Sequence, residues 1–304
     1  SVDLGFETIG NATCTVFDKG NPILTTDPWV VGNPYFGSWT HKYEIPTQQF
    51  ENIYNSKYFW ISHGHPDHLD IESLNIIKES EILIPDHYGD RILRDLKNIG
   101  FKVRKILSGV WIEISENIRI KSYADWNQDG LLLIEISGKN ILVNVNDGSL
   151  RGIKKKLVRE ISKYKNRFLL QLIGATDADM CNLYDQKDNF ISHERLSNNP
   201  SIGKKYSFFM DNLNCNYAIP FSMFHQYQRE DSIHINNYIK PIEDHYVDFD
   251  HSKGILLPPF IIWDCEQNNY KEIKPKMKKV TPFSPKHFGD DWSETLTEKD
   301  KIKI

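Results

Sequence analysis

The chain has 304 residues, of which 39% are hydrophobic and 26% are charged. This composition excludes a largely disordered chain, and the longest apolar runs are too short to cross a bilayer, so we expect no membrane span. The 37 basic and 41 acidic residues give a formal net charge of −4 and form no basic block. We therefore expect no nucleic-acid partner, because phosphate contacts require clustered Lys and Arg.

The cysteines are single and widely spaced, at Cys14, Cys181, Cys215 and Cys265. This spacing excludes a CxxC zinc ribbon and a dense disulfide framework. The start of the chain lacks the pattern of a secretory or transit peptide. Together these features predict a cytoplasmic protein.

The first 60 residues have the pattern of short strands and turns, with Gly- and Pro-containing loops after residue 27. Beyond them, strand and helix patterns alternate. The predicted elements are a strand at 58–61, a helix at 71–79, a strand at 82–85, a helix at 88–99, strands at 101–106, 118–123, 131–136 and 141–145, a helix at 150–164 and a strand at 168–172. This order favours β-sheets covered by helices.

The chain contains no internal repeat and no evident interdomain linker. We predict one domain over residues 1–230. Residues 231–304 have a weaker pattern, and the last thirty are rich in Lys, Pro and Asp. We expect this part to be a C-terminal extension that packs on the same domain.

One short segment concentrates side chains that bind metals, and it reads His63-Gly64-His65-Pro66-Asp67-His68. Imidazole and carboxylate groups are ligands for divalent metals. The segment follows a predicted strand and precedes a predicted helix, so rigid elements hold the loop. His63 and His65 alternate and can point the same way, whereas Asp67 and His68 begin the next turn. The alternative is a polar loop that happens to be rich in histidine.

This HxHxDH segment resembles the signature of the metallo-β-lactamase superfamily, and the resemblance extends over roughly residues 8–230. Asp27, the strand that leads to Asp147, and His225 follow in the order of the superfamily's landmarks. The chain is most similar to the branch of ascorbate-phosphate lactonase and N-acyl-phosphatidylethanolamine phospholipase D, and to the non-Rieske part of CMP-N-acetylneuraminate hydroxylase. The resemblance implies an α/β (α+β) fold, a four-layered αββα sandwich with a dinuclear metal site at the edge between two sheets.

The resemblance also implies a ligand set. His63 and His65 would bind the first metal, Asp67, His68 and His225 would bind the second, and Asp147 would bridge the two.

The superfamily's usual third histidine for the first metal is missing, since residues 122–129 contain none. Asp125 is the best-placed substitute and Asp129 is second. The alternative is a first site that does not form, which would leave one metal or none.

We expect two divalent metal ions, either zinc, manganese or iron, and the extra carboxylate shifts preference toward manganese or iron. The resemblance implies hydrolysis of a small, anionic substrate, such as a phosphodiester, lactone or amide, by a metal-bridged hydroxide. Asp67 is the predicted catalytic carboxylate. His87 is a candidate proton donor or substrate contact, although a surface loop histidine is an equal alternative.

Two other functions stay open. The first is a dinuclear iron oxygenase acting on a sugar-nucleotide or another small molecule. The second is a metal-poor binding domain.

Four further acidic residues have predicted roles. Asp27 is expected to support the motif loop, and Asp70 either orients a ligand histidine or caps the following helix. Asp177 and Asp179 are read as a solvated turn.

Overall fold

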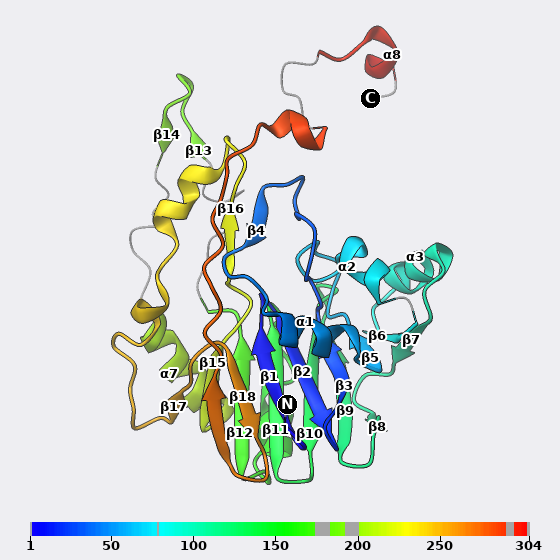
Figure 1. Ribbon diagram of the computed structural model, residues 1–304, viewed down its shortest axis with the longest axis vertical. Helices are drawn as coiled ribbons and strands as arrows, with labels where there is room; N and C mark the ends of the chain where they lie inside the picture. Colours follow the sequence, from blue (N-terminus) through cyan, green and yellow to red (C-terminus); the bar gives the residue numbers. More distant parts are fainter. Residues whose placement is uncertain (1, 78, 174–182, 192–200, 290–294, 303–304) are drawn as a thin grey trace.

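Two large β-sheets form the centre of the molecule, and helices flank them (Figure 1). The computed structural model describes residues 2–77, 79–173, 183–191, 201–289 and 295–302. The first sheet has eight strands in the order β19-β18-β1-β2-β3-β5-β6-β7, and the second has seven in the order β17-β15-β12-β11-β10-β9-β8. The four-layered αββα arrangement predicted from the sequence is confirmed.

The first sheet mixes antiparallel and parallel pairs. Its strands are β1 (Gly5–Ile9), β2 (Thr13–Asp18), β3 (Asn21–Thr26), β5 (Tyr58–Trp60), β6 (Glu81–Pro85), β7 (Val103–Ile106), β18 (Ile261–Asp264) and β19 (Asn269–Glu272).

The second sheet is also mixed. Its strands are β8 (Trp111–Glu113), β9 (Ile118–Ala124), β10 (Gly130–Ile136), β11 (Asn140–Asn146), β12 (Asn166–Gln171), β15 (Tyr217–Pro220) and β17 (Ile255–Leu256). Two small sheets pair β4 (Trp39–His41) with β16 (His225–Tyr227), and β13 (Leu183–Tyr184) with β14 (Phe190–Ile191).

The helices of the described residues are mostly short. The α-helices are α1 (Thr47–Tyr54), α2 (Ile71–Ile76), α3 (Arg91–Ile99), α4 (Lys154–Ile161), α7 (Ile202–Leu213) and α8 (Glu298–Lys301), and the 3₁₀ helices are η1 (Ile233–Tyr238), η2 (Ile242–His245) and η3 (Pro285–Phe288).

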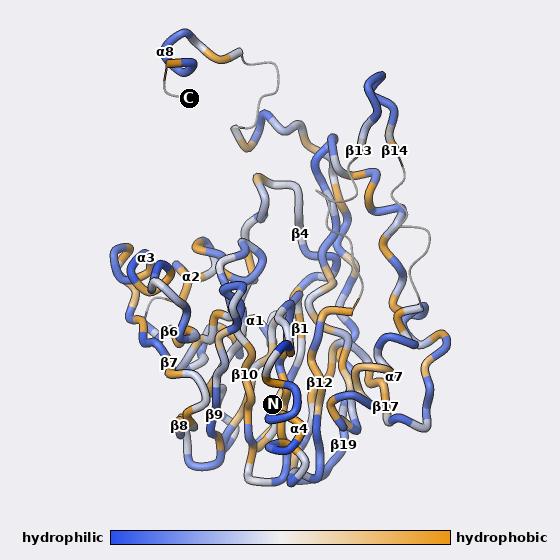
Figure 2. The backbone as a smooth tube through the Cα atoms, turned by 180° about the vertical axis from the view of Figure 1, so that it is seen from behind, coloured by the Kyte–Doolittle hydropathy of each residue, from blue (hydrophilic) through white to orange (hydrophobic). Residues whose placement is uncertain are grey.

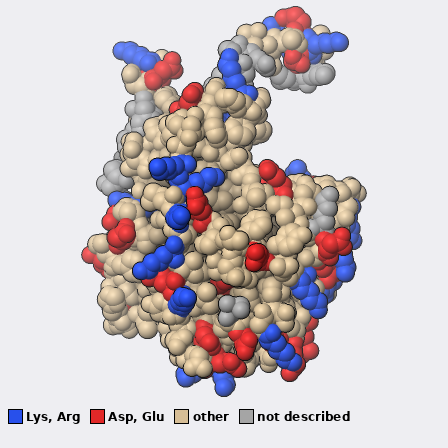
Figure 3. All heavy atoms as spheres, in the orientation of Figure 1, with Lys and Arg blue, Asp and Glu red and all other residues tan. Residues whose placement is uncertain are grey.

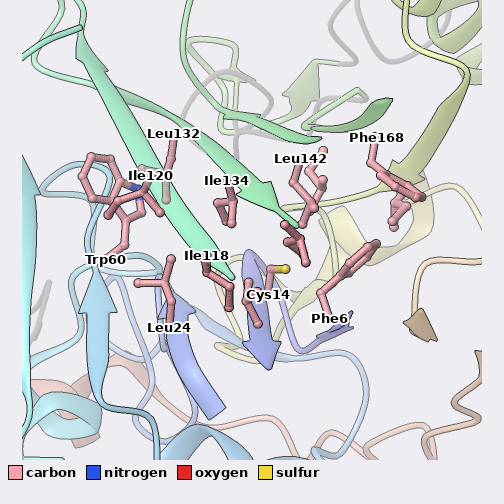
Figure 4. Packing of buried hydrophobic residues seen from close by; sticks show 14 of the residues in the cluster. Phe6, Cys14, Leu24, Trp60, Ile118, Ile120, Leu132, Ile134, Leu142 and Phe168 are labelled. Carbon is pink, nitrogen blue, oxygen red and sulfur yellow. The ribbon is translucent and has the colours of Figure 1, made fainter. Parts of the chain in front are cut away.

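The main core lies between the two sheets. Strand β10 is buried along its whole length, so it carries apolar residues on both faces rather than an alternating pattern. Leu132 and Ile134 belong to the cluster between the sheets, whereas Leu131 and Leu133 belong to the cluster under the helices of the second sheet. Figure 4 shows Leu132 and Ile134 among the side chains of this core, which also includes Phe168.

Helices cover the outer face of each sheet with a few apolar side chains. Ile53 of α1, Leu74 of α2 and Leu96 of α3 share a cluster with strands of the first sheet. Leu157 of α4 and Met210 of α7 share one with strands of the second sheet. Hydrophobic stretches are accordingly prominent in the sheets, whereas the projecting β13–β14 hairpin is mostly hydrophilic (Figure 2).

Two helix predictions need correction. Residues 47–54 form α1, although that region was expected to contain strands and turns. The buried residues of α1 include the polar Gln49 and Asn52, whose side chains donate to the buried Glu7 carboxylate. The sequence of α1 therefore lacks the helical pattern of apolar residues by which a buried helix face is predicted. The helix expected at 150–164 is shorter, because α4 spans only Lys154–Ile161.

Residues 231–304, expected to pack on the same domain, contribute strands to both sheets. Strand β18 pairs with β1 in the first sheet, and β17 pairs with β15 in the second. This part of the chain therefore supplies strands to both sheets and does not only cover their surface.

The described residues contain no helix that is long and apolar enough to cross a membrane. On the face seen in Figure 3, Lys and Arg lie interspersed with Asp and Glu.

Phe168 connects the two sheets and gives a test of this core. Its ring is fully buried and lies 5.1 Å from that of Phe6 and 4.8 Å from that of Trp263, measured between centroids. Phe168→Ala should lower the free energy of unfolding by about 3–5 kcal/mol, because it leaves a cavity. Denaturant unfolding followed by circular dichroism measures this. Phe208→Ala, at a position 63% exposed, is the control and should cost less than about 1 kcal/mol.

Candidate metal centre

The histidine-rich segment forms the loop between β5 and α2 (Figure 1). His63, Asp67 and His68 are buried, whereas Gly64, His65 and Pro66 between them are exposed, so the loop lies at the edge of the interior. The loop ends at Asp70, whose side chain accepts a hydrogen bond from the Ser73 backbone N–H at 2.6 Å and caps α2. Of the two roles considered for Asp70, helix capping is the one confirmed.

Asp27 fixes the start and the end of this loop. It follows β3, is fully buried and has a backbone φ of 36°. Its carboxylate accepts hydrogen bonds from the Ser62 N–H at 2.8 Å and the Ser62 hydroxyl at 2.7 Å. It also lies 2.9 Å from Nδ1 of His68. The expected supporting role of Asp27 is confirmed, and Nε2 of His68 is left to face the centre.

Asp67 is held by three neighbours. The Tyr35 hydroxyl donates to Oδ1 at 2.8 Å, and the Asn11 side-chain amide donates to Oδ2 at 3.1 Å. Nε2 of His68 lies 3.1 Å from Oδ2. Burial opposes ionisation of Asp67, but the charge and hydrogen bond of His68 and the Tyr35 hydroxyl outweigh it and hold its pKa below the usual range. Asp67 is therefore an ionised carboxylate.

His63 and His65 bring two ring nitrogens together. Nε2 of His63 lies 2.8 Å from Nδ1 of His65. Burial and the neighbouring His68 lower the pKa of His63 to about 3, so its ring is neutral and has a lone pair available for a metal.

Asp147 joins the loop to the second sheet. It follows β11, and its Oδ2 lies 3.2 Å from Nε2 of His68 and 3.8 Å from Nε2 of His63. The Ser222 hydroxyl donates to Oδ1 at 2.9 Å. His63, His68 and Asp147 offer ligand atoms that all lie within 4.8 Å of one another. One oxygen of Asp147 thus lies close to a ring nitrogen of each of the two histidines.

The two candidate carboxylates of the 125–129 loop occupy different environments. Asp125 accepts hydrogen bonds from the backbone N–H groups of Asn127 at 2.7 Å and Asp129 at 3.0 Å through one oxygen, and from that of Ser149 at 3.3 Å through the other. Asp129 is buried, and its Oδ1 lies 3.3 Å from Nδ1 of His63. Burial and the nearby Asp147 carboxylate raise the pKa of Asp129 to about 8.

The sequence favoured Asp125, but the contacts place Asp129 beside His63 and commit the Asp125 carboxylate to its own loop. Oδ1 of Asp129 approaches the His63 nitrogen opposite to the one that faces His65.

His225 starts strand β16 and is buried. Its ring stacks on Trp39 with centroids 3.4 Å apart and an angle of 5° between the planes. Burial lowers its pKa to about 4, although the charges of Asp67 and Asp147 oppose this shift. The His225 ring is therefore neutral and lies within the electrostatic reach of both carboxylates.

His87 follows β6 and is buried, and burial lowers its pKa. The chemical role predicted for it remains a prediction. Asp177 and Asp179, read as a solvated turn, lie outside the described residues.

The donor set fits divalent metal ions. Nε2 of His68 lies 3.1 Å from Oδ2 of Asp67 and 3.2 Å from Oδ2 of Asp147, and both ring nitrogens of His225 are buried without a hydrogen-bond partner. Within the described part of the chain, the ion pairs of Asp67, Asp129 and Asp147 are all with histidine side chains. Although burial opposes it, the charges of Asp67 and Asp147 raise the pKa of His68 well above its usual range, so a proton on His68 balances these carboxylates in the metal-free chain. A bound cation can replace this proton and stabilise the same buried carboxylates.

Several supporting residues carry no sequence signal for this role. Asn11 holds Asp67 from the turn between β1 and β2, and Ser222 holds Asp147. Asn146, with a backbone φ of 54°, donates to the Ser62 hydroxyl at 2.8 Å. Tyr35 holds Asp67 from the segment that follows β3. Isolated Asn, Ser and Tyr residues gain these roles only through the tertiary fold.

Comparisons with known proteins give both sequence and structural relatives. No family model matches the chain. A segment of 142 residues is 29% identical to cytidine monophosphate-N-acetylneuraminic acid hydroxylase of Asterias rubens and 28% identical to that of Xenopus laevis. The match covers 44% of this chain but only 22% and 24% of those relatives, so the chain matches about a quarter of their length.

Two solved structures share the fold. Igni18, a metallo hydrolase from Ignicoccus hospitalis, aligns with a TM-score of 0.54 at 12% identity over 89% of this chain and 99% of its own. CmlA, a diiron β-hydroxylase from Streptomyces venezuelae, aligns with a TM-score of 0.52 at 15% identity over 82% of this chain and 50% of its own.

The buried Asp129 gives a test by pH. Because its pKa is raised from 3.8 to about 8, the folded metal-free chain binds this proton more tightly than the unfolded chain. As the pH rises through this interval, the ionising Asp129 should therefore lower the free energy of unfolding. Asp129→Asn should raise the Tm of the metal-free protein at about pH 9 more than at about pH 5.

Thermal unfolding in the presence of a chelator measures this difference. Asp125→Asn is the matched control, since it removes a carboxylate of the same loop that does not contact His63. An equal rise in Tm at both pH values for Asp129→Asn would contradict the raised pKa of Asp129.

Proposed function

We propose that this chain, which has the metallo-β-lactamase fold, is a metal-dependent enzyme with a dinuclear centre that hydrolyses a small, anionic substrate. The observation that carries the proposal is the convergence of His63, His68 and Asp147, whose ligand atoms lie within 4.8 Å of one another. Asp67 adds a buried carboxylate beside His68. The metallo-hydrolase Igni18 has a similar fold, which is consistent with this reading.

The contacts support a division of the ligands between two positions. His63 and His65 form the first through Nε2 and Nδ1, which face each other. Asp67, His68 and His225 form the second, and Asp147 serves both. The ligand set stays as predicted from the sequence, except at Asp125.

In place of Asp125, we assign Asp129 to the first position as a carboxyl group behind a ligand: its Oδ1 lies 3.3 Å from Nδ1 of His63, which also lies 2.9 Å from the Ser62 hydroxyl. A carboxylate behind a ligating histidine fixes the ring orientation and makes the imidazole a stronger donor.

The residues around the centre have separable tasks in hydrolysis. Two bound divalent ions would lower the pKa of a water molecule and polarise the substrate. Asp67 remains ionised, so it orients the attacking water through its carboxylate and can take up its proton transiently. His87 is neutral near pH 7, because burial lowers its pKa, and it can hydrogen-bond the substrate. Cleavage then adds the elements of water across a phosphodiester, lactone or amide bond.

A dinuclear iron oxygenase is the second candidate. Asp67 and Asp147 supply two carboxylate ligands, and such hard ligands favour iron or manganese over zinc. The sequence relatives are named as hydroxylases, and so is the solved structure of CmlA. This reading would direct the enzyme to a sugar-nucleotide or another small molecule.

Metal content separates these candidates and the metal-poor binding domain. Protein purified without added metal should contain about two equivalents of metal by elemental analysis. Zinc or manganese with no oxygen uptake favours hydrolysis. Iron with oxygen consumption favours the oxygenase, and substoichiometric metal favours the binding domain.

Asp67→Ala should abolish turnover, because it removes a ligand and the group that orients the water. The assay is a panel of phosphodiester, lactone and amide substrates, each with zinc, manganese and iron supplied separately. Asp70→Asn is the control, since Asn also caps helices and Asp70 lies outside the centre. Equal activity of Asp67→Ala and the parent would show that another site performs the reaction.

A further inference from the structure

Tyr35 lies in the segment between β3 and β4, and Trp39 begins β4; they contact Asp67 and His225, the outer residues assigned to the second metal position. Tyr35, Phe36 and Gly37 follow one another with backbone φ angles of 56°, 54° and 78°. Two successive non-glycine residues in the left-handed region cost free energy, and such conformations persist where the surrounding structure over-determines them. The contacts of Tyr35 and Trp39 identify what this segment holds.

Tyr35 reaches Asp67. Its hydroxyl donates to Oδ1 at 2.8 Å, while Oδ2 of the same carboxylate faces Nε2 of His68 at 3.1 Å. A hydrogen bond to an ionised group is stronger than one between neutral groups. The Tyr35 hydroxyl therefore fixes one oxygen of Asp67 and leaves the other directed at the centre.

Trp39 contacts His225, which is also assigned to the second metal position. The two rings are nearly parallel, with centroids 3.4 Å apart and 5° between the planes. Tyr227 lies edge-on to Trp39, with centroids 5.9 Å apart, and Trp39 pairs with Tyr227 between β4 and β16. This packing prevents the His225 ring from tilting.

The two contacts form one unit, because the rings of Tyr35 and Trp39 also touch, with centroids 4.5 Å apart. We infer that Tyr35 and Trp39 form an aromatic bracket that positions Asp67 and His225 together for the second metal ion. This inference rests on the proposed function, since it assigns both ligands to one ion. The bracket contacts neither His63 nor His65 by any of these interactions, so it acts selectively on the second position.

The expected effect is a loss of metal affinity at one position. Residues that orient metal ligands typically contribute about 10- to 100-fold to affinity. Tyr35→Phe keeps the ring and removes only the hydrogen bond to Asp67, whereas Trp39→Leu removes the stacked ring. Each should weaken the metal-binding step that fills the second position by about 10-fold or more and leave the other step unchanged. Trp39→Phe retains a flat ring and should restore most of the affinity.

Zinc titration of the metal-free protein by isothermal titration calorimetry measures both steps. The absorption spectrum of the cobalt-substituted protein reports the ligand geometry without any substrate. Tyr54→Phe is the matched control, since it removes a phenolic hydroxyl at a position 50% exposed on α1. The double variant Tyr35→Phe with Trp39→Leu should lose less affinity than the product of the single losses, because the two act as a unit.

The outcomes separate the bracket from the proposed function. Selective weakening of one step, with the Tm kept within the range of the control, supports the bracket. Unchanged steps in both variants, or equal weakening of both steps together with a lowered Tm, would overturn it. A parent protein that binds no zinc, manganese or iron would instead overturn the proposed function.

Discussion

The buried hydrogen bonds of Asp27 are the constraint on which the site depends. This carboxylate lies at the end of β3 and is shielded from solvent, yet it holds both Ser62 and His68. Burial raises the pKa of Asp27, while His68 acts to lower it, so its stability as an anion depends on those partners. The amide of Asn146 lies 3.3 Å from Asp27 and 2.8 Å from the Ser62 hydroxyl, which links the second sheet to the same point.

The centre is therefore assembled from the ends of strands in both sheets. The first sheet supplies Asp27 and the motif loop after β5, and the second supplies Asp129 before β10 and Asp147 after β11. The apolar core between the sheets sets their separation, so packing far from the centre controls the distances within it. Rigid strand ends are also the kind of support that keeps ligands in place before a metal binds.

The sequence predicted the fold through local signals, and the structure brings His63, His68 and Asp147 of the predicted site together. The motif of residues 63–68 needs only six consecutive positions, and the strand before Asp147 is a continuous apolar run. Asp125 and Asp129 are close together in the sequence, so no local pattern distinguishes them. In the structure, backbone N–H groups of the loop bind the Asp125 carboxylate, whereas Asp129 lies beside His63. Helix α1 was missed because its buried face includes polar side chains that serve Glu7. The supporting residues Asn11 and Ser222 act across long sequence separations, which no local pattern records.

The pairing of β18 with β1 has a consequence for how the chain folds. Gly5 of β1 pairs with Asp264 of β18. Both edges of β1, the first strand, are therefore hydrogen-bonded only after β18, one of the last strands, has joined the sheet. Such a contact carries a high loop-closure entropy and slows folding. During synthesis, β1 can pair with β2 early but keeps its other edge open until residues 261–264 leave the ribosome. An open edge strand is a template for aggregation, so β1 offers one unpaired edge to other chains for most of the time that residues 1–264 are being synthesised.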